Sequence, residues 1–391
     1  MARLPVLRGV MVGAVLLSSG CASVTLPESG PQSLEGYRPT RNIGLLDSRQ
    51  RREELARLSE SQREDLCLER SLYRAPPIPV EVTGHGPGGS IYSHYNPFGD
   101  AWRYVDDMVG GWLTTQDRAY LDSLREWLLE SKRQGGFTRL RPDPDKYYLL
   151  DPLFNLRFGL KPVFVAYDVL QQEGAITEEQ QTILHQWLEE VVESTDLGYC
   201  GEMEDWCDSP NHTTMHAGST FMLWGGVTSN PKWFRKGIDY FVDALRNTRS
   251  DGSNAFDVSA RKGRRSVRKQ NQIVGYLVVI AEVAARHGYD LYNIKVGDAS
   301  MWSNFEFLVN VLDNSSLLKR HTGSASFDEP FLHHNRHNDE TVAWFELLRR
   351  RFPDDPRVVR FTKKVFASRP WSSPAYGGNL TCFVGQFAAR E

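Results

Sequence analysis

The stretch that decides the fold is DPLFNLRFGLKPVFVAYDVLQQEGAITEEQQTILHQWLEEVVES, residues 151–194. Apolar residues recur at the helical period over 151–172 and again over 177–194. The polar turn 173–176 separates the two segments, and Thr177 followed by two glutamates is a typical helix start. Since the turn is short, the two helices are expected to pack as an antiparallel pair.

The same alternation of helix and short polar turn continues along the chain. It predicts helices over 102–109, 118–132, 212–227, 231–247, 267–287, 301–318, 339–352 and 356–367, and a charged helix over 46–72. No βαβ pattern is present, and no fixed repeat period supports a regular solenoid. We therefore predict an all-α fold, an incomplete (α/α) toroid or barrel of antiparallel helix pairs, forming a single catalytic domain over 46–391.

The N-terminus has the pattern of an export signal. Arg3 and Arg8 lead into the short apolar segment 9–17, and a run of small residues ends at Cys21. This pattern predicts a signal peptide over 1–21 with lipidation at Cys21, although ordinary secretion with cleavage nearby is an alternative. The Pro-, Gly- and Ser-rich residues 22–45 are expected to form a tether. The expected location is a bacterial periplasm, with the lipid anchoring the protein to the outer membrane.

Charge and cysteine content limit the remaining possibilities. The net charge of −3 provides no overall field for binding nucleic acid, so we expect no nucleic-acid partner. Besides Cys21 there are Cys67, Cys200, Cys207 and Cys382, which allow three disulfide connectivities in an oxidising compartment. Cys200–Cys207 is the local option, and Cys67–Cys382 would then join the two ends of the domain.

Residues 206–217, WCDSPNHTTMHA, contain the first candidate for chemistry. Asn211 and His212 stand at a predicted helix start, where the helix dipole disfavours a protonated imidazole. A neutral imidazole can act as a base, and an amide can donate to an anionic oxygen. The alternative is structural, because Asn is a common N-cap residue.

Residues 259–271, SARKGRRSVRKQN, form the second candidate, which we interpret as a basic helix. Arg261 and Arg265 share one helical face with Arg268, and Lys262 and Arg265 share another with Lys269. Like charges this close repel one another, which favours an anion-binding site. The alternative is a solvated helix face.

Two further groups of side chains must be weighed. His333 and His337 have the spacing of a helical metal pair, but no glutamate general base stands between them, so we predict no metal site and interpret His334 as a carbohydrate contact. The carboxylates before Asn211 and at Asp257 are compatible with a glycoside hydrolase as an alternative function, since that reaction needs two carboxyl groups. The acidic group before Asn211 consists of Glu202, Glu204, Asp205 and Asp208.

The chain resembles the alginate lyase family of periplasmic α/α-toroid polysaccharide lyases over roughly residues 145–350. The resemblance lies in Asn211-His212, in the segment 261–293 with its Gly-Tyr-Asp-Leu turn, and in Ala-Trp-Phe-Glu at 343–346. It implies β-elimination of a 1,4-linked polyuronate without a cofactor. In the family, Asn and Arg neutralise the uronate carboxylate while His and Tyr share the base and acid roles. Carried over, Asn211 with Arg261 or Lys262 would neutralise, and His212 would be the base or its partner.

This sequence departs from the family at the tyrosine. Lys269 stands in its place, Gln270 follows where the family usually has His, and Pro210 replaces the first Asn of Asn-Asn-His. Either Lys269 transfers the proton, or another tyrosine such as Tyr276 enters the site. The catalytic candidates are Asn211, His212, Arg261, Lys262, Lys269 and Tyr276, and the substrate-binding candidates are Arg157, Lys161, Arg264, Arg265, Tyr148, Trp206 and His334.

We therefore predict a polysaccharide lyase that cleaves a 1,4-linked polyuronate, alginate-like or glucuronan-like, leaving unsaturated uronate ends. The expected partner is the acidic polysaccharide substrate. Two alternatives stay open at this point. One is a glycoside hydrolase of an acidic polysaccharide on the same kind of toroid, and the other is a non-catalytic protein that binds a polyuronate.

Overall fold

The computed structural model describes residues 22–68, 75–83, 97–141, 150–196, 211–260, 262–327, 341–365 and 369–386. Within these ranges, helices carry almost all of the regular structure. They are α1 (Ser48–Leu55), α2 (Glu60–Cys67), α3 (Pro97–Thr115), α4 (Arg118–Arg133), α5 (Leu150–Gln172), α6 (Glu178–Thr195), α8 (His212–Val227), α9 (Pro231–Arg246), α10 (Ser266–Arg286), α11 (Met301–Asp313), α12 (Ser316–Thr322), α13 (Phe345–Arg351), α14 (Pro356–Thr362) and α15 (Leu380–Val384).

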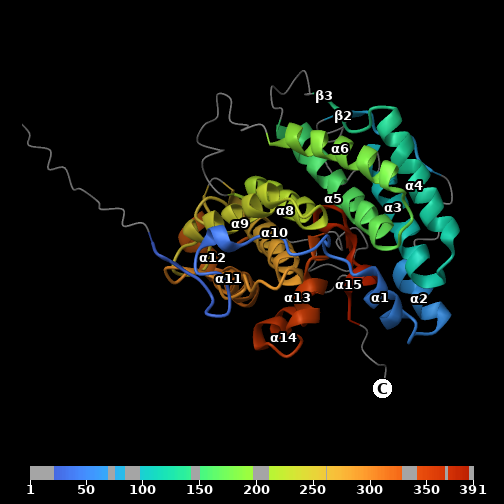
Figure 1. Ribbon diagram of the computed structural model, residues 1–391. Coiled ribbons are helices and arrows are strands. Elements are labelled where there is room, and N and C mark those ends of the chain that lie inside the picture. Colours follow the sequence, from blue (N-terminus) through green and yellow to red (C-terminus); the bar gives the residue numbers. More distant parts are fainter. Residues whose placement is uncertain are drawn as a thin grey trace, which may run out of the picture.

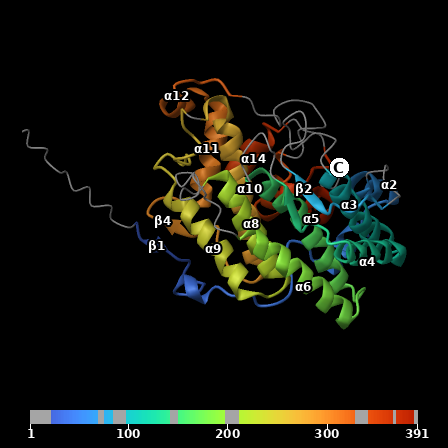
Figure 2. The same ribbon diagram turned by 90° about the horizontal axis from the view of Figure 1, so that it is seen from above.

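Sequence neighbours pack as helix pairs, and the pairs follow one another across the molecule. α3 packs against α4 and α5, α8 packs against α5, α9 and α10, and α10 packs against α11. Figures 1 and 2 show α4 at one end of this array, α5, α8 and α10 in the middle, and α11 and α12 at the other end. The fold is thus the predicted incomplete α/α toroid.

Short two-stranded pairings complete the described regular structure. β1 (Val24–Thr25) pairs antiparallel with β4 (Lys295–Val296). β2 (Glu81–Thr83) pairs parallel with β3 (Arg139–Arg141), and β5 (Ser372–Ser373) pairs antiparallel with β6 (Gly378–Asn379). None of the helices in the described ranges is both long enough and apolar enough to cross a bilayer.

The central helix α8 is buried nearly all round, and its glycines explain how neighbours come so close. A Cβ at Gly225 would lie 2.2 Å from the backbone nitrogen of Phe234 on α9, and one at Gly218 would lie 2.5 Å from Cβ of Tyr240. Only glycine permits these approaches. These close approaches hold α8 against α9 in the middle of the helical array.

Several predicted elements differ from the structure. The single helix expected over 46–72 is two helices in its described part, because Ser59 caps a new start with a capping box to Gln62. The helix expected over 301–318 breaks at Asn314, whose side-chain oxygen accepts from the backbone nitrogen of Ser316 at 3.2 Å. The helix expected over 356–367 ends at Thr362.

Residues 22–45, expected as a tether, lie against the helical body in the structure. Tyr37, Ile43 and Leu45 are buried. The backbone nitrogen of Ile43 donates to the carbonyl of Gly226 on α8 at 3.1 Å, and that of Gly44 donates to Asp168 on α5 at 2.8 Å. The segment is thus packed because its apolar side chains and backbone groups find partners on the helices.

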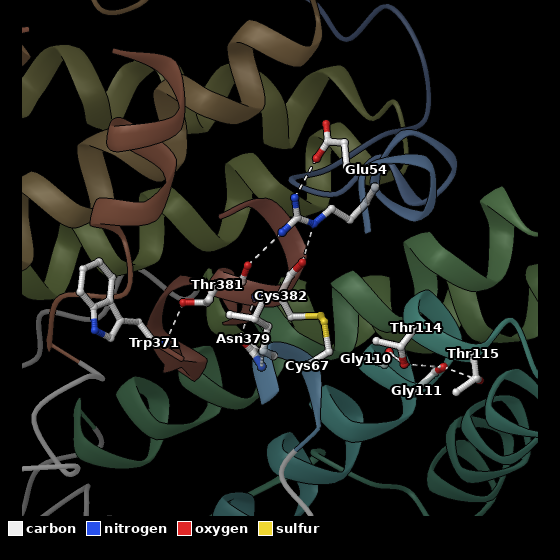
Figure 3. Close-up of a disulfide and its surroundings, with 12 residues drawn as sticks. Glu54, Cys67, Gly110, Gly111, Thr114, Thr115, Trp371, Asn379, Thr381 and Cys382 are labelled. Atoms are coloured by element: carbon white, nitrogen blue, oxygen red, sulfur yellow. Dashed lines mark hydrogen bonds and ion pairs between the residues drawn. A yellow bond between two sulfur atoms is a disulfide. The ribbon is translucent and has the colours of Figure 1, made fainter. Parts of the chain in front are cut away.

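Cys67 and Cys382 form a disulfide across 315 residues of sequence, which confirms that pairing among the options considered. Figure 3 shows it between α2 and α15, beside Asn379 and Thr381. Asn379 donates to the carbonyl of Leu66 at 3.0 Å, and Arg51 of α1 donates to the carbonyl of Thr381 at 3.0 Å. Cys200 and Cys207 lie outside the described residues. The bridge thus joins the two ends of the domain.

Replacing both bridged cysteines, Cys67→Ala with Cys382→Ala, is expected to lower the free energy of unfolding by about 2–5 kcal/mol. The unfolded chain regains the freedom that a cross-link over so long a loop removes. Urea denaturation of the variant and the parent protein measures the difference. An unchanged unfolding midpoint would contradict this expectation.

Candidate active site

The candidate site is built around the first turn of α8. Asn211 is its N-cap residue, and its side-chain oxygen accepts from the backbone nitrogens of Thr213 at 2.8 Å and Thr214 at 3.3 Å. The side-chain oxygen of Thr214 in turn accepts from the backbone nitrogen of Asn211 at 2.9 Å, which completes a capping box. The structural interpretation of Asn211 is therefore correct, and it also fixes the amide group beside His212.

His212 is bound to a carboxylate from a distant part of the chain. Its ring Nδ1 lies 2.9 Å from Oδ1 of Asp257, and its backbone nitrogen donates to Oδ2 of the same carboxylate at 2.7 Å. The Asp257 side chain is 0 % exposed and that of His212 is 8 % exposed. Burial lowers the pKa of His212, and Lys269 and Lys262 lower it further against the opposing effect of Asp257. The imidazole is thus neutral at neutral pH.

Two lysines of the basic segment, Lys262 and Lys269, act on the His212–Asp257 pair. Nζ of Lys262 is 3.9 Å from Oδ1 of Asp257 and stands over the ring of Phe256. Lys269 donates to Oε1 of Gln272 at 3.1 Å. Burial is the main cause that lowers the pKa of Lys269 to about 8; Asp257 opposes this shift, and the nearby cations Lys262, Arg268 and Arg265 add to it.

The interpretation of 259–271 as one basic helix is wrong. Helix α10 begins at Ser266, after a short 3₁₀ turn over Gly263–Arg265. Gly263 has a φ of +50°, which interrupts helical geometry, and the backbone nitrogen of Lys262 donates to the carbonyl of Ser259. Lys262 therefore reaches the site from a turn, and its proximity to Lys269 does not come from helical spacing.

The arginines of this turn face outward. Arg264 and Arg265 are exposed, and neither forms an ion pair with another residue in the part of the chain that the structure describes. They extend the positive charge of Lys262 and Lys269 to the surface. Such exposed cations can bind an anionic polymer at little cost in desolvation.

A second group of ionisable residues lies deeper, between α5, α8 and α10. The ring of His216 contacts those of Phe158 at 4.5 Å between centroids and Tyr276 at 5.1 Å. Nζ of Lys161 lies 5.5 Å from the centroid of Tyr276 and has no hydrogen-bond partner among the described residues. Arg157 donates to the carbonyl of Thr195 at 2.6 Å. These side chains are fully or almost fully buried.

Burial governs the charge state of this deeper group. It lowers the pKa of Lys161 well below its usual value, with Arg157 adding to the shift, and lowers that of Arg157 to about 10. The pKa of His216 falls for the same reason, and Lys161 and Arg157 depress it further. Tyr276 contacts this second histidine and has 0 % exposure, so the structure places it behind the candidate site.

Several predicted site residues lie outside the described residues, namely Arg261, Tyr148, Trp206, His334 and Cys21. The histidine run with His333 and His337 lies outside them as well. Within the described ranges, no group of three or more His, Cys, Asp or Glu side chains is arranged to hold a metal ion.

Comparison with known families matches residues 99–317 to the family described as alginate lyase, which is more than half of the 391 residues. The chain belongs to the alginate lyase family. No curated protein sequence matches this chain.

Solved structures agree with this fold. Alginate lyase A1-III from Sphingomonas species A1 superposes with a TM-score of 0.72 at 18% identity, covering 91% of this chain and 100% of that one. A histidine variant of the same enzyme, complexed with tetrasaccharide, gives a TM-score of 0.72 at 19% identity over 93% of this chain and 100% of that one. An alginate lyase from Bacteroides ovatus gives 0.57 at 12% identity, over 85% and 92%. At these identities the likeness supports the fold.

For this member of the alginate lyase family, sequence reasoning missed part of the site. The sequence suggests Asp257 only as a hydrolase carboxylate, whereas the structure pairs it with His212, 45 residues away. His216 was not considered, although it follows His212 by one helical turn. That spacing on a predicted helix was the available signal. Nothing in the sequence signals the pairing of Asp257.

The buried lysine of this family member leads to a stability prediction. Lys161→Met is expected to raise the free energy of unfolding by about 1–4 kcal/mol near neutral pH, because it replaces a buried lysine, whose charged form burial disfavours, with an apolar side chain of similar size. The gain should shrink as pH rises towards about 10.4, where lysine in the unfolded chain also loses its proton. Chemical denaturation of both proteins at several pH values measures it.

The exposed Lys319 provides the control. Lys319→Met should change the free energy of unfolding by less than about 0.5 kcal/mol at every pH. Destabilisation by Lys161→Met, or a gain independent of pH, would contradict the assignment of an uncompensated buried lysine.

Proposed function

We propose that this protein is a polysaccharide lyase that cleaves a 1,4-linked polyuronate by β-elimination and leaves unsaturated uronate ends. The single observation that carries the proposal is a neutral imidazole held on a buried carboxylate beside two lysines. Membership of the alginate lyase family supports it. The name of a relative complexed with tetrasaccharide supports an oligosaccharide ligand for the fold.

β-Elimination begins with removal of the proton at C5 of the uronate. That proton is only weakly acidic until the neighbouring carboxylate is neutralised. Lys262 is suited to this task, and Asn211 stands next to the base at the helix N-terminus, where an anion is favoured. Arg261 is proposed for the same role on the basis of the family motif.

His212 is the proposed base. Its Nδ1 faces Asp257, so Nε2 is the ring nitrogen that can accept the proton from C5. The hydroxyl of Thr213 lies 3.3 Å from Nε2. The electron pair of the broken C5–H bond forms the C4=C5 double bond, and the bond between C4 and O4 breaks.

Lys269 is the proposed acid. It gives a proton to the leaving O4, in place of the tyrosine that the family uses. A pKa of about 8 leaves Lys269 protonated at neutral pH, yet acidic enough to transfer the proton. Arg264 and Arg265 are proposed to bind the uronates on either side of the cleaved bond.

The geometry does not favour the hydrolase alternative. A hydrolase acid must reach the glycosidic oxygen, but Asp257 is 0 % exposed and both of its oxygens face His212. Asp205, the other carboxylate considered for that role, lies outside the described residues. A non-catalytic polyuronate-binding protein remains an outcome that the assay below distinguishes.

We also propose that the protein is exported to the periplasm and lipidated at Cys21. The signal-like N-terminal sequence supports this proposal. The Cys67–Cys382 disulfide supports it independently, because such bonds persist in oxidising compartments.

The proposed activity is tested by incubating the full protein with alginate, polyglucuronate and other polyuronates. The expected result is a rise in ultraviolet absorbance from the new C4=C5 double bond, at a rate lowered by about 100-fold or more in His212→Ala. New reducing ends without that absorbance would indicate a hydrolase. Saturable, salt-sensitive binding with no product would indicate a binding protein, and either outcome would overturn the lyase proposal.

The role of Lys269 gives a pH prediction. Activity should fall as pH rises through about 8, because the acid then loses its proton, and it should fall on the acid side below the usual histidine pKa of 6.5. Lys269→Tyr should keep measurable activity and move the alkaline limb towards about pH 10. Lys269→Met should lower kcat by about 100-fold or more.

The control for these variants is Lys319→Tyr, which changes an exposed lysine far along the sequence and should leave the pH profile unchanged. If the alkaline limb of Lys269→Tyr stays near pH 8, another group is the acid.

A further inference from the structure

We propose that Asp257 is a positioning residue, which holds His212 in the tautomer with its proton on Nδ1 and its lone pair on Nε2. Its catalytic meaning rests on the proposed lyase function. The geometry that supports it is a contact at two points, because one carboxylate accepts from the ring and from the backbone of the same residue.

An ionised carboxylate can only accept hydrogen bonds. Burial by itself would raise the pKa of Asp257, but its interactions with His212, including two hydrogen bonds, and the charge of Lys262 together lower it, so the group is ionised. At 2.9 Å from Oδ1, Nδ1 of His212 must therefore carry a proton. The second bond, from the backbone nitrogen to Oδ2, fixes the plane of the carboxylate relative to the first turn of α8.

The backbone that carries Asp257 is itself tightly held. The Arg249 side chain donates to the carbonyls of Asn254 at 3.3 Å, Ala255 at 2.8 Å and Val258 at 3.0 Å. The side-chain oxygen of Asn254 accepts a hydrogen bond from the backbone nitrogen of Asp257 at 3.0 Å. The loop 249–258 therefore folds around one guanidinium group and one amide.

Gln270 links this loop to the helices. Its Oε1 accepts a hydrogen bond from the backbone nitrogen of Asn254 at 2.9 Å. Its Nε2 donates to the carbonyls of Gly252 at 3.2 Å and Asn304 at 3.1 Å. Gln270 lies on α10 and Asn304 on α11. Buried amides thus connect α11 and α10 to the loop that presents Asp257. Amides do not titrate, so this support does not change with pH.

The charges around His212 explain why the carboxylate matters. The charged and titratable groups that act on it are Asp257 from the loop, Lys262 from the turn before α10, Lys269 on α10, and His216 on α8. The two lysines depress the pKa of His212 and disfavour protonation of the base. Asp257 opposes them, so it strengthens the base as well as orienting it.

The wild-type protein provides the first test. Nitrogen NMR of histidine labelled with ¹⁵N distinguishes a protonated from an unprotonated ring nitrogen, and His212→Gln identifies the His212 signals by their absence. The expected result near neutral pH is a protonated Nδ1 and an unprotonated Nε2. The reverse tautomer would overturn the proposal. This measurement does not depend on any substrate, so it stands even if the proposed lyase activity fails.

The second test is Asp257→Asn in the lyase assay. If the amide oxygen keeps the bond from the backbone nitrogen, the amide nitrogen faces Nδ1 and shifts the ring proton to Nε2. The expected result is a fall in kcat of about 100-fold or more with KM within about threefold of the parent value. The remaining activity should show its acid limb at lower pH, since the charge that raised the pKa of His212 is gone. An unmoved acid limb with a small loss of kcat would overturn the proposal.

A matched control separates this role from a purely structural one. Asp355 also accepts a backbone nitrogen, that of Arg357 at 2.9 Å, and also binds a cationic side chain, but it caps the peripheral helix α14. Asp355→Asn should lower stability without moving the pH profile. In a His212→Gln background, Asp257→Asn should cause no further loss of activity, because a positioning residue acts only through the residue it holds. A further loss of tenfold or so in that background would contradict the proposal.

Discussion

A carboxylate removed from water needs hydrogen-bond donors or cations around it, and His212, the first residue of α8, supplies two donors to Asp257. One donor is the backbone nitrogen and the other is the ring Nδ1, so satisfying the carboxylate also fixes the orientation of the ring. The remaining positive charge comes from Lys262 at 3.9 Å. The candidate site thus follows from one electrostatic constraint, and the surrounding helices hold its parts in register.

The same region concentrates cations with few anions to balance them. Lys161 is fully buried with no hydrogen-bond partner in the described part of the chain, and Arg157 adds to its cost. Stability alone would favour an apolar side chain at this position. Ionisable groups that cost stability in this way are more frequent near functional sites than in an ordinary core.

Much of the fold could be predicted from the sequence, because helix boundaries are local. The helix predicted over 212–227 is α8, and Asn211 is its N-cap, which is the structural alternative that the sequence offers for this residue. The basic segment shows the limit, since the positive φ of Gly263 ends the helical geometry on which the predicted charge spacing depended. The Asp257–His212 pair joins residues 45 positions apart, and only the packing of the loop 249–258 against α8 and α10 brings them together. No local pattern encodes that approach.

The exchange of the family tyrosine for Lys269 becomes physically consistent in this setting. A lysine in water is too weak an acid to release its proton readily at neutral pH. Burial and the neighbouring cations lower the pKa of Lys269 to about 8, which suits the acid role proposed for it. Gln270 has a supporting part, because its buried side chain holds the loop of Asp257. The cation cluster would also depress the base, and the carboxylate of Asp257 counters this effect on His212. A site that uses a lysine as acid beside a histidine as base therefore needs a buried anion on the histidine, and this chain has one.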